Sequence, residues 1–166
     1  MIRHAGVSLL LFLFSFPVLA IEAGTPAPSL SMQALEDGGA AVATSSLKGS
    51  VVYVDFWASW CTPCLRSMPA LRTLHGKHRE QGFVVVGVNK DVNPAEAERF
   101  LRRFPVSFPL VDDSGDAVAK AFDVKTMPSG YLIDRAGVVR QVHRGFTAET
   151  EATLSRDIEA LLKDKP

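Results

Sequence analysis

The sequence predicts an α/β sandwich in which a central mixed sheet is flanked by helices. Residues 51–57 (VVYVDFW) and 83–88 (FVVVGV) are apolar at almost every position, as is typical of strands buried on both faces. A helical pattern lies between these strands, which makes a parallel β-α-β unit. Residues 130–134 and 138–142 surround an Arg-Ala-Gly turn and predict an antiparallel hairpin. A parallel half followed by an antiparallel half gives a mixed sheet.

Three longer helices are expected around this sheet. The first covers about residues 63–79, the second begins at Pro94 and runs toward Phe104, and the last follows a Thr147 cap to about Lys163. The first helix is expected to turn one face to the core, and that face carries Leu65, Met68, Leu71, Leu74 and His75.

Smaller elements are expected around the two halves. A short amino-terminal hairpin joins residues 30–34 and 40–44 across the turn Asp37-Gly38-Gly39. A short strand at residues 108–111 and a short helix at 118–122 lie between the parallel half and the hairpin.

Composition restricts the classes of function. The chain has 166 residues, of which 47% are hydrophobic and 22% charged, so one compact core can form. Eighteen basic residues balance eighteen acidic ones, which argues against binding of nucleic acid or an anionic membrane surface through bulk charge. The two cysteines are too few for a disulfide-rich scaffold or a four-cysteine zinc site.

The amino terminus has the layout of a secretory signal. Arg3 and His4 precede an apolar run, and Ala20 offers a small residue at a cleavage position. We therefore expect a signal peptide at residues 1–20, a mature domain at 21–166 and a periplasmic location, where thiols tend to be oxidised. The alternative is an uncleaved anchor, and only in that case is the membrane expected as a partner.

Cys61 and Cys64 are separated by Thr62 and Pro63 and lie where the first strong strand gives way to a helix. A thiolate near a helix amino terminus is stabilised by the positive end of the helix dipole and by unpaired N–H groups. The second cysteine is close enough to displace a mixed disulfide formed by the first. We therefore assign Cys61 as the nucleophile and Cys64 as the resolving thiol.

Three other uses of this pair are possible. A structural disulfide would close a ring of only four residues, worth about 2 kcal/mol at most. A metal site would have two thiolates, with the nearest histidines, His75 and His78, more than two helical turns away, and we expect no resident metal. Inert buried thiols would have no reason to lie at a strand-to-helix corner. Redox chemistry is therefore favoured.

The segment VDFWASWCTPC, with Pro69 five residues after Cys64, resembles the active site of thioredoxins. The export signal, the long segment 93–125 and the run TMPSGYLID at residues 126–134 resemble the secreted TlpA-like branch. The resemblance covers nearly all of the chain after the signal. It implies the thioredoxin fold and a redox-active disulfide between Cys61 and Cys64, with no other cofactor.

The resemblance also gives roles to Met127, Pro128 and Asp55. Met127-Pro128 matches a loop that faces the cysteines with a cis peptide bond and presents the backbone of Met127 to an incoming segment. The alternative is an ordinary proline at the start of a strand. Asp55 stands inside a buried strand, where an ionised, unpaired carboxylate costs several kcal/mol. It matches the buried acid that accepts a proton from the resolving thiol, and the alternative is a solvated strand end. The lysine that accompanies this acid is replaced by Gly87, with Lys90 nearby.

Other residues have simpler interpretations. Trp57 is expected in the core and Trp60, next to Cys61, on an exposed apolar rim that docks a partner. His75, His78 and His143 are expected to be surface or hydrogen-bonded histidines.

The favoured function is a thiol:disulfide oxidoreductase that exchanges two electrons with cysteine-containing exported proteins. Pro63 before Cys64 resembles the reducing members, such as those of cytochrome maturation, which implies a membrane thiol-reductant donor as a second partner. The alternative is a secreted Cu(I) chaperone that uses Cys61, Cys64 and Met127 or a histidine, because soft sulfur ligands suit Cu(I). A peroxidase is less favoured, since Cys61 lacks the preceding Pro and Thr of peroxiredoxins.

Overall fold

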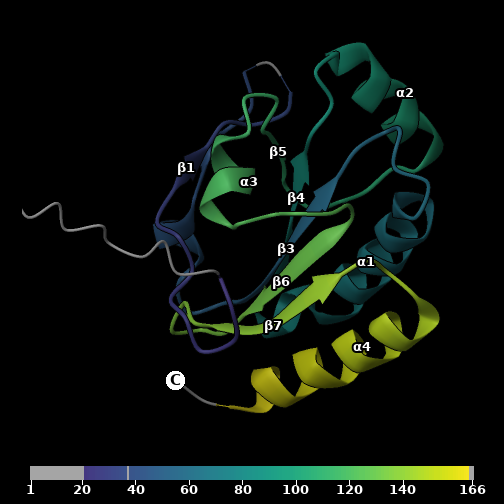
Figure 1. Ribbon diagram of the computed structural model, residues 1–166. Helices are drawn as coiled ribbons and strands as arrows, with labels where there is room; N and C mark the ends of the chain where they lie inside the picture. Colours follow the sequence, from purple (N-terminus) through teal and green to yellow (C-terminus); the bar gives the residue numbers. More distant parts are fainter. Residues whose placement is uncertain (1–20, 37, 165–166) are drawn as a thin grey trace, which may run out of the picture.

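A computed structural model describes residues 21–36 and 38–164. Its main sheet has five strands in the order β5-β4-β3-β6-β7 (Figure 1). In chain order these strands are β3 (Val51–Trp57), β4 (Phe83–Asn89), β5 (Leu110–Asp112), β6 (Ser129–Ile133) and β7 (Val139–Arg144). Strands β3, β4 and β5 are parallel, whereas β6 runs antiparallel to β3 and β7 antiparallel to β6. The predicted mixed sheet is therefore confirmed.

The alternation of side chains along β3 divides the core into two layers. Tyr53 and Trp57 pack on one face with residues of α1 (Cys64–His78) and α4 (Ala148–Lys163), while Val54 and Phe56 pack on the other with Val118 of α3 (Ala117–Ala121). Figure 1 shows α1 and α4 on one side of the sheet, and α3 with the amino-terminal hairpin on the other. All seven residues of β3 are buried, as the apolar run predicts for a central strand.

The helices follow the predicted order. They are α1 (Cys64–His78), α2 (Pro94–Arg103), α3 (Ala117–Ala121) and α4 (Ala148–Lys163), with short 3-10 turns η1 (Thr44–Leu47) and η2 (Arg79–Gln81). The expected Thr147 cap of α4 is present, because its hydroxyl accepts a hydrogen bond from the Thr150 N–H at 3.2 Å. Asn93 caps α2 in the same way through the Ala95 N–H.

The amino-terminal hairpin is shorter than expected. Its strands β1 (Ser31–Met32) and β2 (Val42–Ala43) pair antiparallel over two residues each. Ala34 also forms an isolated bridge with Val111 of β5, so this segment covers the edge of the main sheet.

Two expectations about α1 are wrong. Leu65 is 42% exposed, because Cys64 takes the inward position of the first turn and leaves its neighbour at the surface. His75 lies on the core face as expected, but the expectation of surface or hydrogen-bonded histidines is wrong, because His78 is buried as well and Nδ1 of His75 and both ring nitrogens of His78 make no hydrogen bond. Their rings instead contact Phe108 and Phe83 edge to face. His143, in contrast, is hydrogen-bonded as expected.

The expected signal peptide at residues 1–20 lies outside the described residues. Within residues 21–36 and 38–164, no helix has both the length and the apolar character needed to cross a bilayer.

Candidate active site

The two cysteines form a disulfide at the corner between β3 and α1. Their sulfur atoms are 2.11 Å apart, and their Cα atoms are separated by 5.3 Å. The chain turns twice to reach this arrangement, since the Cys61 N–H donates to the Ala58 carbonyl and the Cys64 N–H donates to the Cys61 carbonyl. The strand-to-helix corner predicted at these cysteines is therefore present.

Cys61 precedes a 15-residue helix whose amino terminus carries no side-chain cap. The expectation of unpaired N–H groups is wrong for the first residues of α1, because tight turns bond their N–H groups to the backbone carbonyls of Cys61, Thr62 and Pro63. No side-chain oxygen competes for the positive end of the helix. This end favours a negative charge on the preceding sulfur once the disulfide is reduced. Cys61 retains 4% exposure and Cys64 none, so the outer sulfur is the one that a substrate can reach.

Exposed apolar side chains lie next to both cysteines in the chain. Trp60, immediately before Cys61, is 63% exposed, and Leu65, immediately after Cys64, is 42% exposed. An open depression lies beside them, lined by Thr62, Pro63, Leu65, Arg66, Phe146 and Thr147. Phe146, which is itself buried, and Thr147 line this depression from the segment before α4; the sequence predicts Thr147 as a helix cap but predicts neither residue as part of the site. Trp57, by contrast, is fully buried, as expected.

The segment before β6 lies at the same end of the sheet as the disulfide. Because β6 runs antiparallel to β3, its first residue, Ser129, pairs with Phe56 near the end of β3. The peptide bond between Met127 and Pro128 is cis, and the Pro128 carbonyl accepts a hydrogen bond from the Gly145 N–H at 2.8 Å. The Ser129 hydroxyl donates to the Thr126 carbonyl at 2.8 Å, which fixes the other side of this loop.

Asp55 is 1% exposed, and neither carboxyl oxygen makes a hydrogen bond. Burial raises the pKa of the Asp55 carboxyl well above its usual range, and the nearby hydroxyl of Ser67 on α1 only partly opposes this rise. Ser67 lies one turn after Cys64, so Asp55 faces the start of the helix that carries the inner cysteine. A raised pKa makes the Asp55 carboxylate a stronger base than an exposed one, so it is suited to take a proton from a neighbouring thiol.

No cation pairs with Asp55 among the ion pairs of the described residues. Lys90 instead contacts the carboxylates of Asp113 and Asp116, at 3.0 and 2.5 Å. Gly87 lies beside Asp55 in the parallel register, and a Cβ there would be 2.7 Å from the Leu110 side chain and 3.2 Å from the Trp57 indole nitrogen. Core side chains therefore fill the space next to Gly87, the position at which the thioredoxins that this chain resembles have a lysine.

A second acid, Asp91, fixes the loop before Cys61 and was missed from the sequence. Its carboxylate accepts hydrogen bonds from the Ser59 N–H at 3.0 Å, the Ser59 hydroxyl at 2.8 Å and the Asn89 side-chain amide at 2.9 Å. Asp91 is 2% exposed, so these three neutral donors offset the cost of burying its charge. The signal in the sequence is an acid two residues after a buried strand, at the edge where parallel strands end.

Comparisons with known proteins agree with this geometry. The Redoxin family model matches residues 22–161. The thiol-disulfide oxidoreductase ResA of Geobacillus kaustophilus is 32% identical over 142 residues, which are 86% of this chain and 79% of the relative. ResA of Halalkalibacterium halodurans is 34% identical over 128 residues, which are 77% of this chain and 72% of the relative.

A solved structure shows the same fold. The crystal structure of a Chlorobium tepidum protein assigned as thiol:disulfide interchange protein DsbE has a TM-score of 0.81 and 37% identity, covering 86% of this chain and 99% of that one. The Redoxin match at residues 22–161 includes both the sheet and the corner that holds the cysteines. The chain belongs to the Redoxin family of the thioredoxin superfamily, among its thiol-disulfide oxidoreductases.

Proposed function

We propose that this enzyme exchanges two electrons with cysteines of exported proteins in the periplasm, in the reducing direction. The observation that carries the proposal is the Cys61–Cys64 disulfide at an uncapped helix amino terminus, above a buried carboxyl without a partner. Exposed Trp60 and the loop at Met127 and Pro128 are the surfaces that receive the substrate.

The first step is the attack of the reduced Cys61 thiolate on a substrate disulfide. One substrate sulfur becomes bonded to Cys61, and the other leaves as a thiolate that takes a proton from solvent. Cys61 is the attacking group because it keeps the exposed face of the pair and lies at the positive end of α1.

The second step releases the substrate. Cys64 loses its proton and attacks the Cys61 sulfur, so the Cys61–Cys64 disulfide forms and the remaining substrate sulfur leaves as a thiolate. Asp55, which faces the first turns of α1 next to Ser67, accepts the Cys64 proton in this step. Both substrate cysteines end reduced, and the enzyme ends oxidised by two electrons. A membrane thiol-reductant donor then restores the dithiol.

Trapping with Cys64→Ser tests this scheme. The variant lacks the resolving thiol, so it is expected to accumulate mixed disulfides between Cys61 and exported proteins, which mass spectrometry then identifies. Cys61→Ser is the matched control and is expected to trap none. A Cys64→Ser protein recovered entirely unmodified contradicts the assignment of Cys61 as nucleophile.

The copper alternative is tested on the same preparation. The wild-type protein is first titrated with dithiothreitol and thiols are counted, then the reduced protein is titrated with Cu(I). A reversible two-electron exchange without tight copper binding supports the oxidoreductase, whereas tight binding of one Cu(I) with slow exchange supports the chaperone.

A further inference from the structure

Four residues form one row across the sheet next to the active site. In the order of the strands they are Gly87 on β4, Asp55 on β3, Gly130 on β6 and His143 on β7. Directly paired residues project to the same face, with about 4.8 Å between neighbouring strands. Asp55 and His143 therefore point to the same side of the sheet, and the residue between them has no side chain.

Tyr53 fills the space that Gly130 leaves open. A Cβ placed on Gly130 would collide with the Tyr53 hydroxyl and ring, so the phenol crosses this position. The hydroxyl oxygen of Tyr53 lies 3.2 Å from Nδ1 of His143 and forms a hydrogen bond with it. Tyr53 is 1% exposed and lies two residues before Asp55 on the same face of β3. The buried Tyr53 phenol is thus hydrogen-bonded to the half-buried His143 imidazole, and the phenol lies two residues from an unpartnered carboxyl on the same face of β3.

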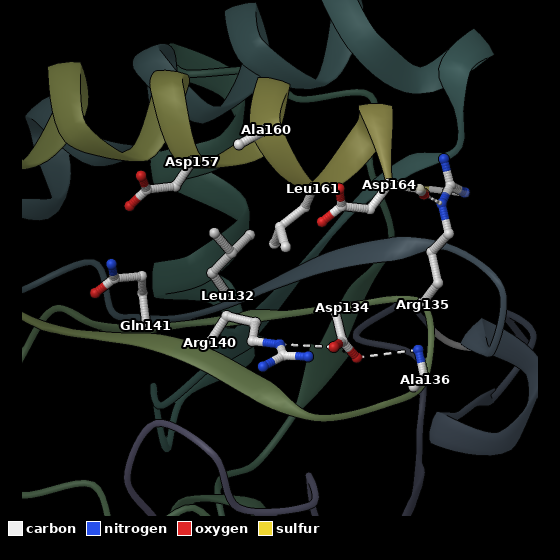
Figure 2. Close-up of a pocket in the computed structure, with 10 residues that line it drawn as sticks. All are labelled: Leu132, Asp134, Arg135, Ala136, Arg140, Gln141, Asp157, Ala160, Leu161 and Asp164. Atoms are coloured by element: carbon white, nitrogen blue, oxygen red, sulfur yellow. Dashed lines mark hydrogen bonds and ion pairs between the residues drawn. The ribbon is translucent and has the colours of Figure 1, made fainter. Parts of the chain in front are cut away.

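The far end of this row lies near water. Gln141 is two residues before His143 on β7 and therefore projects to the same face. It lines an open depression of about 530 Å³ between the β6–β7 hairpin and α4. Figure 2 shows Gln141 and Asp157 on facing walls of this depression, one from β7 and one from α4. One carboxyl oxygen of Asp157 is buried without a partner, and its charge opposes the fall in the pKa of His143 that burial causes.

We propose that Tyr53 and His143 conduct the proton between Asp55 and the solvent of the α4 depression, which makes them proton-transfer residues that act through Asp55. This proposal rests on the proposed role of Asp55 as acceptor of the Cys64 proton. A docked substrate covers the outer side of the disulfide, and Asp55 itself is buried, so the proton on Asp55 needs another route to water. The row of residues across the sheet provides that route, on the side away from the substrate.

The proton balance closes over one catalytic cycle. Asp55 takes the proton of Cys64 and passes it to the Tyr53 oxygen through a water molecule, because the Asp55 carboxyl and the Tyr53 hydroxyl are not hydrogen-bonded to each other. The Tyr53 hydroxyl proton passes to Nδ1 of His143, and Nε2 gives its proton to solvent. His143 then holds its proton on Nδ1 and donates to Tyr53. When the membrane donor reduces the disulfide, one proton enters at Nε2 and the same transfers run backward.

The groups that face His143 define the expected pH dependence. Tyr53 and Asp55 face it from β3 and Asp157 from α4. Burial lowers the pKa of His143, so its neutral form, which accepts from Tyr53, persists below the usual range for histidine.

The test uses the full reduced protein and dithiobis(nitrobenzoate). Attack by Cys61 releases one coloured thiolate and leaves a mixed disulfide, and attack by Cys64 releases the second, so stopped-flow absorbance separates the two steps. Tyr53→Phe and His143→Ala are expected to slow the second release at least about tenfold, with the first release nearly unchanged; this is less than the roughly 10²–10⁴-fold of a direct general base, because the two residues act through Asp55. Added imidazole is expected to restore the second release in His143→Ala.

Two controls separate the possible failures. His78→Gln removes a buried imidazole from α1 outside the row and is expected to leave both releases unchanged. Suppose that Asp55→Asn slows the second release, while in Tyr53→Phe and His143→Ala the rate of the second release depends on pH as it does in wild type. The route through Tyr53 and His143 is then wrong, and the role of Asp55 stands. If Asp55→Asn has no effect on the second release, both are wrong. If His143→Ala is slow but imidazole does not restore it, the imidazole is structural and the route is overturned.

Discussion

Asp91 accepts hydrogen bonds from both the N–H and the hydroxyl of Ser59, which lies two residues before the outer cysteine. The two residues are 32 positions apart in the sequence and meet where β3 and β4 end at the same edge of the sheet. The loop that carries Cys61 is therefore held by a buried carboxylate as well as by its own turn.

Removal of this anchor is expected to destabilise the protein and slow its first chemical step. Asp91→Ala leaves the Ser59 N–H and the Asn89 amide without their acceptor, at a cost of about 3 kcal/mol in the free energy of unfolding. Ser59→Ala removes one hydroxyl and costs about 1 kcal/mol. Urea unfolding and the rate of the first release from dithiobis(nitrobenzoate) measure both effects.

Asp112→Ala is the control for the Asp91 variant. Asp112 is an acid at the end of the adjacent strand β5, and its carboxylate accepts hydrogen bonds from Ser114 instead of Ser59. It is expected to leave the first release unchanged. Equal first-release rates in Asp91→Ala and wild type would show that the anchor does not position Cys61.

Gly130 and Gly76 predict opposite effects of the same substitution. Gly130→Ala drives a methyl group into the Tyr53 phenol and is expected to destabilise the protein by about 3 kcal/mol. Gly76 lies inside α1, and a Cβ added there would point into open space. Gly76→Ala is therefore expected to stabilise the protein by about 0.5–1 kcal/mol, since alanine loses less backbone entropy in a helix. Urea midpoints of the oxidised proteins measure the difference. A neutral Gly130→Ala would contradict the close approach of Tyr53.

Trp60 is expected to contribute to substrate binding and not to the chemistry. Trp60→Ala removes the largest exposed apolar group beside Cys61 and is expected to lower kcat/KM for a disulfide-containing protein about tenfold, equivalent to about 1.4 kcal/mol. The small reagent dithiobis(nitrobenzoate) serves as the internal control, and its first release is expected to stay within about twofold. An equal loss of rate with the protein substrate and with dithiobis(nitrobenzoate) would show instead that Trp60 positions Cys61.

Asp55 is expected to make stability depend on pH. Burial raises the pKa of Asp55 in the folded protein above the value of the unfolded chain, so the folded state binds more protons. Its contribution is fully present below the unfolded pKa, near 4, and is lost as the pH rises from there toward the raised value, by at most about 1.4 kcal/mol per pH unit.

Asp55→Asn removes this dependence. Its stability relative to wild type is expected to increase from acidic to neutral pH, as measured by urea unfolding of the oxidised proteins at several pH values. A constant difference between the two proteins across this range would show that the Asp55 carboxyl is not buried in its neutral form.

Local sequence was sufficient for several parts of the site. The strand, the corner with Cys61 and Cys64 and the following helix are adjacent in the chain, so apolar runs and spacing predict them together. The burial of Asp55 follows from the same reasoning, because a central strand with helices on both faces has no side open to water. The Leu65 error shows where periodicity stops: helical spacing admits either neighbour on the inner face, and the disulfide decides that Cys64 takes it.

Pairing across the sheet decided the rest. Tyr53 and His143 are 90 positions apart, and their hydrogen bond exists because β7 aligns His143 with Gly130 and β6 aligns Gly130 with Asp55. A shift of one residue in either register would turn these side chains to the opposite face. The sequence by itself determined which residues carry sulfur chemistry and on which elements they lie. Only the tertiary structure determined which polar groups meet in the core, because strand register is a long-range property that no local pattern specifies.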